Sequence, residues 1–164
     1  MQSTRGGSPT LAWSYNASPL VIVAFYIAKK LRERIKIDDN GRCAYCRTAE
    51  ANSGLPLTHD HIQPRAKGGR TNFENVCQAC RSCNEYKSDS TEALDPLTGE
   101  TVPLFNPRHQ RWSEHFSWSV DSTQINGLTM IGRATVIALK MNNATIVPAR
   151  RRWAAAGWHP PKEE

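Results

Sequence analysis

Five cysteines, all between residues 43 and 83, constrain the fold of this chain more than any other feature. Four of them form two C-x-x-C pairs, Cys43-Ala-Tyr-Cys46 and Cys80-Arg-Ser-Cys83. Each such turn can point two sulfur atoms at one metal ion, so two turns supply the four thiolates of a tetrahedral zinc site. Disulfide frameworks of secreted domains usually spread an even number of cysteines more widely. The pattern predicts a zinc site in a reducing compartment; buried free thiols or redox thiols are the alternative.

The fifth cysteine, Cys77, lies three residues before Cys80 and could compete with it as a ligand. Free cysteine is commonly buried as a small apolar residue, and we expect this of Cys77 on a strand. Four cysteines fill the coordination sphere of zinc and leave no position open for water. The predicted zinc ion is therefore structural.

Length and charge set broader limits on the fold and its partners. The 164 residues make one ordinary domain or a compact core with extensions, and the formal charge of +6 favours an anionic partner such as nucleic acid. The apolar run at residues 19–28 is shorter than the roughly 20 residues that span a bilayer and lacks the flanks of a signal peptide. We therefore expect a cytoplasmic protein that makes no membrane contact.

Composition and periodicity divide the chain into four parts. Residues 1–18 are rich in Ser, Gly and Thr, and we expect them to be disordered. Residues 19–41 predict a helix from about Pro19 to Ile37 followed by a turn. Residues 42–90 hold all the cysteines, and residues 91–164 form a C-terminal extension that we expect to pack on them.

Within the extension, alternation at residues 116–120 predicts a strand, and a second short strand follows a turn. Residues 132–141 and 143–156 have helical spacing, with Pro148 tolerable only near the first turn of the second helix. Arginines and tryptophans interleave here. They could bind nucleic acid, or pack and solvate the helices, and the sequence leaves both open.

The residues that suggest a chemistry lie between and just after the C-x-x-C pairs. They are His59-Asp60-His61, Pro64-Arg65, Gly68-Gly69, Glu74-Asn75-Val76, Asn84 and Lys87. Together with the cysteines, this order resembles the HNH endonucleases, and more narrowly the branch whose nuclease module is clamped by a four-cysteine zinc. The resemblance covers residues 42 to about 88.

The resemblance implies an α+β fold: a small ββα-metal core clamped by a four-cysteine zinc site, with flanking helices. It implies that Asp60 and Asn84 bind a catalytic metal ion and that His61 is the general base. Asn75 would brace the loop between the strands and orient that histidine.

Phosphodiester hydrolysis accounts for these residue types independently. A neutral imidazole, with an ordinary pKa of about 6.5, can take a proton from water near neutral pH. Mg²⁺ or Mn²⁺ prefers oxygen ligands, and two protein ligands leave positions open for phosphate and water. Arg65 and Lys87 could contact the phosphate. We therefore predict a metal-dependent DNA endonuclease, with RNA left open as a substrate and the oligomeric state not indicated.

Two alternatives stay open at the level of sequence. The chain could be a zinc-ribbon module that binds nucleic acid without cleaving it.

In a strand over residues 58–61, His59 and His61 would share one face while Asp60 points the other way, so a ligand and a base in adjacent positions require local distortion. His59 is most simply an exposed strand residue, with a role as a further ligand or as support for the site as the other readings.

Overall fold

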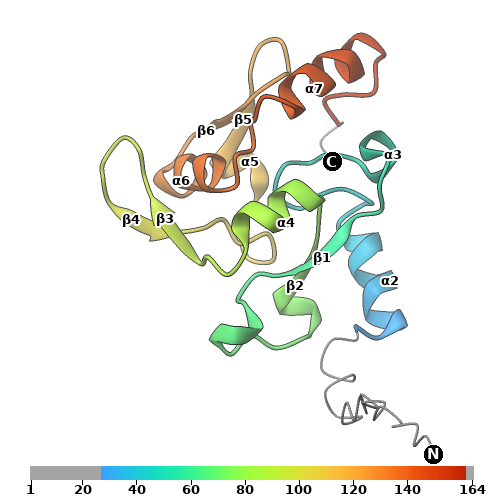
Figure 1. Cartoon of the computed structure of the whole chain (residues 1–164), viewed down its shortest axis with the longest axis vertical. Helices are drawn as coiled ribbons and strands as arrows, with labels where there is room; N and C mark the ends of the chain where they lie inside the picture. Colours follow the sequence, from blue (N-terminus) through green and yellow to red (C-terminus); the bar gives the residue numbers. More distant parts are fainter. Residues whose placement is uncertain (1–26, 162–164) are drawn as a thin grey trace, which may run out of the picture.

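The structure, a computed structural model, describes residues 27–161 and has the mixed α+β architecture that the sequence predicts. The disorder expected for residues 1–18 lies outside the described residues, as does the first part of the expected N-terminal helix. Within residues 27–161 the strands pair into three two-stranded antiparallel sheets (Figure 1). In chain order the elements are α2 (Lys29–Asp38), α3 (Glu50–Ser53), β1 (Thr58–His61), the 3₁₀ turns η1 (Arg65–Lys67) and η2 (Phe73–Asn75), β2 (Val76–Ala79), α4 (Arg81–Lys87), β3 (Glu92–Leu94), β4 (Thr101–Pro103), α5 (Trp112–His115), β5 (Phe116–Trp118), β6 (Ile125–Gly127), α6 (Met130–Ala138) and α7 (Ile146–Ala155).

The first described helix, α2, begins at Lys29, and the two described residues before it, Ile27 and Ala28, are not helical. It buries only Ile35 and leaves its charged residues in solvent. The turn that ends it carries Asp39, whose carboxylate accepts a hydrogen bond from the backbone N–H of Gln78 in β2. The acidic turn thus attaches α2 to the central hairpin.

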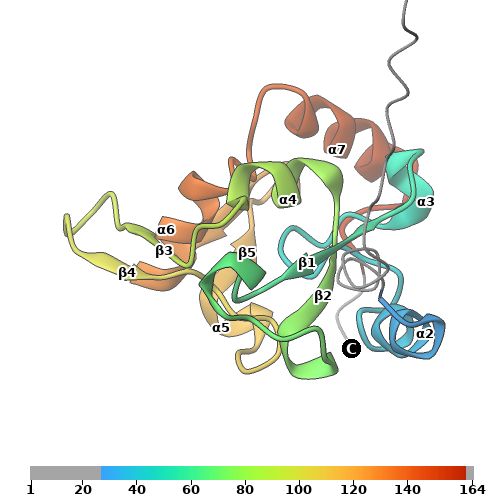
Figure 2. The same ribbon diagram turned by 60° about the horizontal axis from the view of Figure 1, so that its bottom comes forward.

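The hairpin of β1 and β2 is the centre of the cysteine-rich part. The strands are antiparallel, with Asp60 opposite Cys77 and His61 opposite Val76. Residues 62–75 join them through the two 3₁₀ turns. The helix α4 follows β2 directly and contacts both strands, while α2 contacts β2 (Figure 2). Two strands and the helix after them therefore form one local unit.

One hydrophobic core joins this unit to the C-terminal extension. Trp112 of α5 donates a hydrogen bond from Nε1 to the carbonyl oxygen of Tyr45, at 2.8 Å. Because this contact joins the first C-x-x-C turn to the extension, the two parts are packed as one body. The larger buried apolar residues are Tyr45, Leu57, Phe105, Trp112, Phe116, Ile125, Leu139 and Met141.

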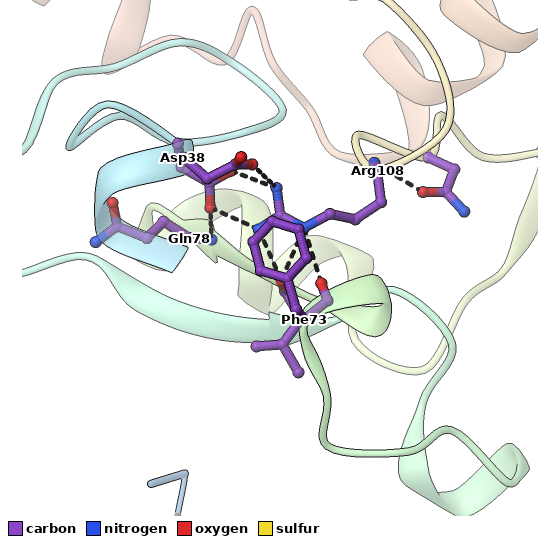
Figure 3. Close-up of polar contacts among 7 residues, drawn as sticks. Asp38, Phe73, Gln78 and Arg108 are labelled. Atoms are coloured by element: carbon purple, nitrogen blue, oxygen red, sulfur yellow. Dashed lines mark hydrogen bonds and ion pairs between the residues drawn. The ribbon is translucent and has the colours of Figure 1, made fainter. Parts of the chain in front are cut away.

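Arg108 of the extension lies against the hairpin beside Asp38 and Phe73 (Figure 3). Its side chain is 3% exposed and pairs with Asp39 and Asp38, each at 2.8 Å. It also donates hydrogen bonds to the backbone carbonyls of Phe73 and Val76, and its guanidinium carbon lies 4.7 Å from the centroid of the Phe73 ring. One guanidinium therefore joins the end of α2, the η2 turn and the start of β2.

We expect Arg108→Met to lower the free energy of unfolding by about 3 kcal/mol, because it leaves the buried Asp39 carboxylate without its partner. Urea unfolding followed by circular dichroism measures the change. The exposed neighbour Arg111 provides the control, since Arg111→Met should change stability by no more than about 0.5 kcal/mol. Equal effects of the two substitutions would contradict this role of Arg108.

Candidate active site and zinc site

The four cysteines of the C-x-x-C pairs converge on one point. Their sulfur atoms all lie within 4.8 Å of one another, and the Sγ atoms of Cys46 and Cys80 are 3.6 Å apart. A tetrahedron with Zn–S bonds of about 2.3 Å has edges of about 3.8 Å, so the cluster fits a zinc site. The two turns also point backbone donors at sulfur: the N–H groups of Cys46 and Cys83 face the sulfurs of Cys43 and Cys80.

Cys77 is not part of this cluster. It is fully buried on β2, opposite Asp60, where burial raises the pKa of its thiol well above the ordinary value. The structure therefore gives Cys77 the apolar strand position expected from the sequence.

The side of the hairpin that faces α4 carries the Asp60 carboxylate. Asp60 is 4% exposed; it accepts a hydrogen bond from the Tyr45 hydroxyl at 2.7 Å, and the Lys87 Nζ lies 3.0 Å from its Oδ2. Burial raises the pKa of Asp60, while the Lys87 charge and the Tyr45 hydrogen bond act in the opposite direction. Burial also raises the pKa of Tyr45 well above its ordinary value, which keeps the hydroxyl protonated as a donor.

Asn84 lies on the same side of the hairpin as Asp60. Its Nδ2 donates to Thr58 Oγ1 at 3.0 Å, and Thr58 and Asp60 share one face of β1 because they are two residues apart. On α4, Asn84 and Lys87 share one face because they are three residues apart. Two polar links thus cross from β1 to α4, Thr58 to Asn84 and Asp60 to Lys87, and they bring together three of the predicted site residues.

The second cysteine pair fixes where α4 begins. Cys80 is the residue before the first turn of the helix, and its sulfur accepts the backbone N–H of Cys83. Since Asn84 follows Cys83 directly, the position of the amide depends on the geometry of the cysteine cluster. The predicted metal ligand and the zinc site are therefore mechanically connected.

His61 is the last residue of β1 and, because it follows Asp60 directly, its side chain points to the opposite face of the strand. It is half-buried, and its Nε2 lies 2.9 Å from Thr71 Oγ1. Burial lowers the pKa of His61, and this outweighs the opposite effect of the neighbouring Asp60 carboxylate. The imidazole is therefore held in its neutral form near neutral pH. His59 is half-buried, and its Nε2 has no hydrogen-bond partner among residues 27–161.

Asn75 spans the loop that follows His61. Its Oδ1 accepts the N–H of Gln63 at 2.8 Å, and its Nδ2 donates to the carbonyls of Gln63 and Arg70. A side chain at Gly69 would collide with the Gln63 carbonyl, so the loop requires glycine there. The amide therefore braces the loop, while its effect on the orientation of His61 stays a prediction.

The two basic residues predicted to contact phosphate lie in different environments. Arg65 is exposed on η1, four residues after His61. Lys87 is 1% exposed, and its ammonium donates to the carbonyl oxygen of His61 at 3.0 Å as well as pairing with Asp60. In this conformation Lys87 faces the buried carboxylate rather than solvent.

Residues 43–94 match the model of a protein family described as HNH endonuclease. The match covers 52 of the 164 residues, and we call residues 43–94 the HNH segment. The match includes the four clustered cysteines and the whole unit of β1, β2 and α4, so the resemblance inferred from the sequence is confirmed. The family implies a nucleic-acid substrate. No curated protein matches the chain, and no helix within residues 27–161 is long and apolar enough to cross a membrane.

Several residues that shape the HNH segment could not be identified from the sequence. Tyr45 lies between two cysteines, Thr58 and Thr71 look like ordinary polar residues, and Arg108 belongs to a basic run that suggested nucleic acid. Their roles depend on contacts between residues 10 to 70 positions apart. Local spacing carries no signal for such contacts.

We expect Cys83→Ala to abolish zinc binding and cooperative folding, because structural zinc contributes on the order of 10 kcal/mol in small domains. Elemental analysis of the purified protein measures zinc per chain. The matched control is Cys77→Ala, which removes the buried cysteine outside the cluster and should leave one zinc ion bound. Loss of zinc in both variants would contradict the assignment of the ligands.

Proposed function

We propose that the HNH segment is a metal-dependent endonuclease that hydrolyses phosphodiester bonds in DNA. One observation carries the proposal: Asp60 of β1 and Asn84 of α4 lie on the same side of the hairpin, within a segment that matches the HNH family. On this proposal β1, β2 and α4 make a ββα-metal core, and the four-cysteine site holds its two ends together.

The oxygen atoms of Asp60 and Asn84 would hold the catalytic cation. Asn84 uses its Nδ2 as a donor to Thr58, which leaves Oδ1 available as a ligand. A carboxylate and an amide oxygen suit Mg²⁺ or Mn²⁺ and do not favour zinc. The bound cation would supply Lewis-acid stabilisation of charge on the phosphate oxygens.

His61 is the proposed general base. The lowered pKa leaves its ring able to accept a proton from the attacking water near neutral pH. The Thr71 hydroxyl fixes one ring nitrogen, and the Asn75 brace fixes the loop that carries Thr71. These two contacts would hold the ring at the edge of the hairpin.

Charge supports an approach of the DNA backbone along the loop between the strands. Arg65, Lys67 and Arg70 are exposed there, close in sequence to His61. Arg65 is the more direct candidate for a phosphate contact, because Lys87 would first have to leave the Asp60 carboxylate. In the conformation described, Lys87 neutralises that carboxylate.

We expect His61→Ala to lower plasmid cleavage at least about a hundredfold while zinc content stays unchanged, because general-base catalysis contributes about 10² to 10⁴ in rate. The assay follows supercoiled plasmid with Mg²⁺, Mn²⁺ or EDTA. The exposed His109 supplies the control, and His109→Ala should cleave at the wild-type rate. Plasmid binding by the wild-type protein with no cleavage in any metal would favour a nucleic-acid-binding zinc module instead.

Asn84→Ala should weaken Mn²⁺ binding by about tenfold or more, since even residues that only support metal ligands change affinity by 10- to 100-fold. Electron paramagnetic resonance of free Mn²⁺ measures the affinity directly. The control is Glu85→Ala, which removes an exposed carboxylate from the next position of α4. Equal Mn²⁺ affinity in the wild type and Asn84→Ala would remove Asn84 from the ligand set.

A further inference from the structure

Arg150 of α7 is the largest side chain that is fully buried in the described structure. Its Nη1 donates to the Thr123 carbonyl at 3.2 Å and to Asn142 Oδ1 at 3.1 Å. Its guanidinium carbon lies 5.2 Å from the centroid of the Trp118 ring. These contacts account for one of its three nitrogen atoms and for one face of the guanidinium plane.

The other two nitrogens of Arg150 have no oxygen acceptor. Nε and Nη2 are buried without an oxygen acceptor, and no carboxylate within residues 27–161 forms an ion pair with this side chain. A guanidinium does not give up its proton inside proteins, and a buried cation without a counter-charge is strongly unfavourable. The surroundings of Arg150 therefore have to supply negative charge.

The cysteine cluster is the group in place to supply that charge. Ala149, the neighbour of Arg150 on α7, lines one cavity with Cys80, and the Cys80 sulfur lies 3.6 Å from that of Cys46. Burial lowers the pKa of Arg150, and Cys46 opposes that effect most, through its charge and a side-chain hydrogen bond, while Cys83 and Cys80 act in the same direction. Neutral thiols offer little to a cation, but four thiolates around one Zn²⁺ carry a net charge of −2. A zinc-loaded cluster would thus match both the charge and the unused N–H groups of Arg150.

We infer that Arg150 is the counter-cation of the zinc centre and that it couples the C-terminal helix α7 to metal occupancy. The inference rests on the zinc site proposed above and extends it to a residue about 70 positions from the nearest cysteine pair. Guanidinium N–H groups would donate to zinc-bound sulfur, as partners of metal ligands commonly do. Arg150 acts here as a positioning residue and does not touch substrate.

The same helix covers the exposed edge of the cluster. Cys80 is the only partly exposed member of the four, and it lines a cavity of about 370 Å³ together with Ile146 and Trp153 of α7. Loosening α7 would open this wall beside Cys80. Loss of Arg150 should therefore speed the escape of zinc as well as weaken its binding.

The experiment compares zinc release from the full chain to a chromogenic chelator. We expect Arg150→Met and Arg150→Gln to release zinc at least about tenfold faster than the wild type. Arg150→Lys keeps the charge, so its release rate should lie between that of the wild type and those of the two neutral variants. The control is Arg152→Met on the exposed face of α7, which should match the wild type. Release at the wild-type rate from folded Arg150→Met or Arg150→Gln overturns the inference.

Two further measurements separate a counter-cation from a residue that only fills space. Cobalt in place of zinc should show a shifted sulfur-to-metal charge-transfer band in the neutral variants and a band close to the wild type in Arg150→Lys. Thermal unfolding of the wild type and of Arg150→Lys, each with and without chelator, measures how far the metal raises the unfolding temperature. We expect this increase to be larger in the wild type. A wild-type chain that retains no zinc refutes the zinc site itself, whereas bands and stabilities that do not respond to the charge at position 150 refute only the role of Arg150.

Discussion

The convergence of four cysteine sulfurs is the constraint on which the rest of this structure depends. The cluster joins the Cys43–Cys46 turn to the turn that starts α4, and these lie on opposite sides of the β1–β2 hairpin in sequence. A two-stranded hairpin is marginal by itself in water, and α4 has only seven residues. Both gain from a strong link between these turns, and a structural metal bound at the cluster would supply one.

A buried polar group lies beside this cluster where an apolar core would be expected. Asp60 and Lys87 are almost completely buried and pair with each other, and Tyr45 donates to the same carboxylate. A buried ion pair is seldom the most stable choice for a core, because both charges lose their hydration. Its presence between β1 and α4 is consistent with a carboxylate kept for chemistry, with the ammonium balancing its charge when no other cation is bound.

The sequence predicted the parts that depend on local spacing and missed those that depend on distant contacts. The α+β class, the clustering of the cysteines and the separate position of Cys77 all follow from residue type and short-range pattern. The start of α2 at Lys29, the hairpin of β3 and β4, and the short helices α3 and α5 did not. Arg108 and Arg150 show the physical reason, because exposed and buried arginines look alike in sequence, and both here are buried against segments far along the chain.

The proposed function requires two distinct metal positions, and anomalous diffraction from crystals soaked in Mn²⁺ tests this most directly. Data collected at the zinc and manganese absorption edges locate each ion separately. We expect zinc among the four cysteine sulfurs and manganese bound by the oxygens of Asp60 and Asn84, with Lys87 displaced or sharing the carboxylate. Saturating Mn²⁺ with no manganese peak at these oxygens, and Lys87 still paired with Asp60, would contradict the proposed function.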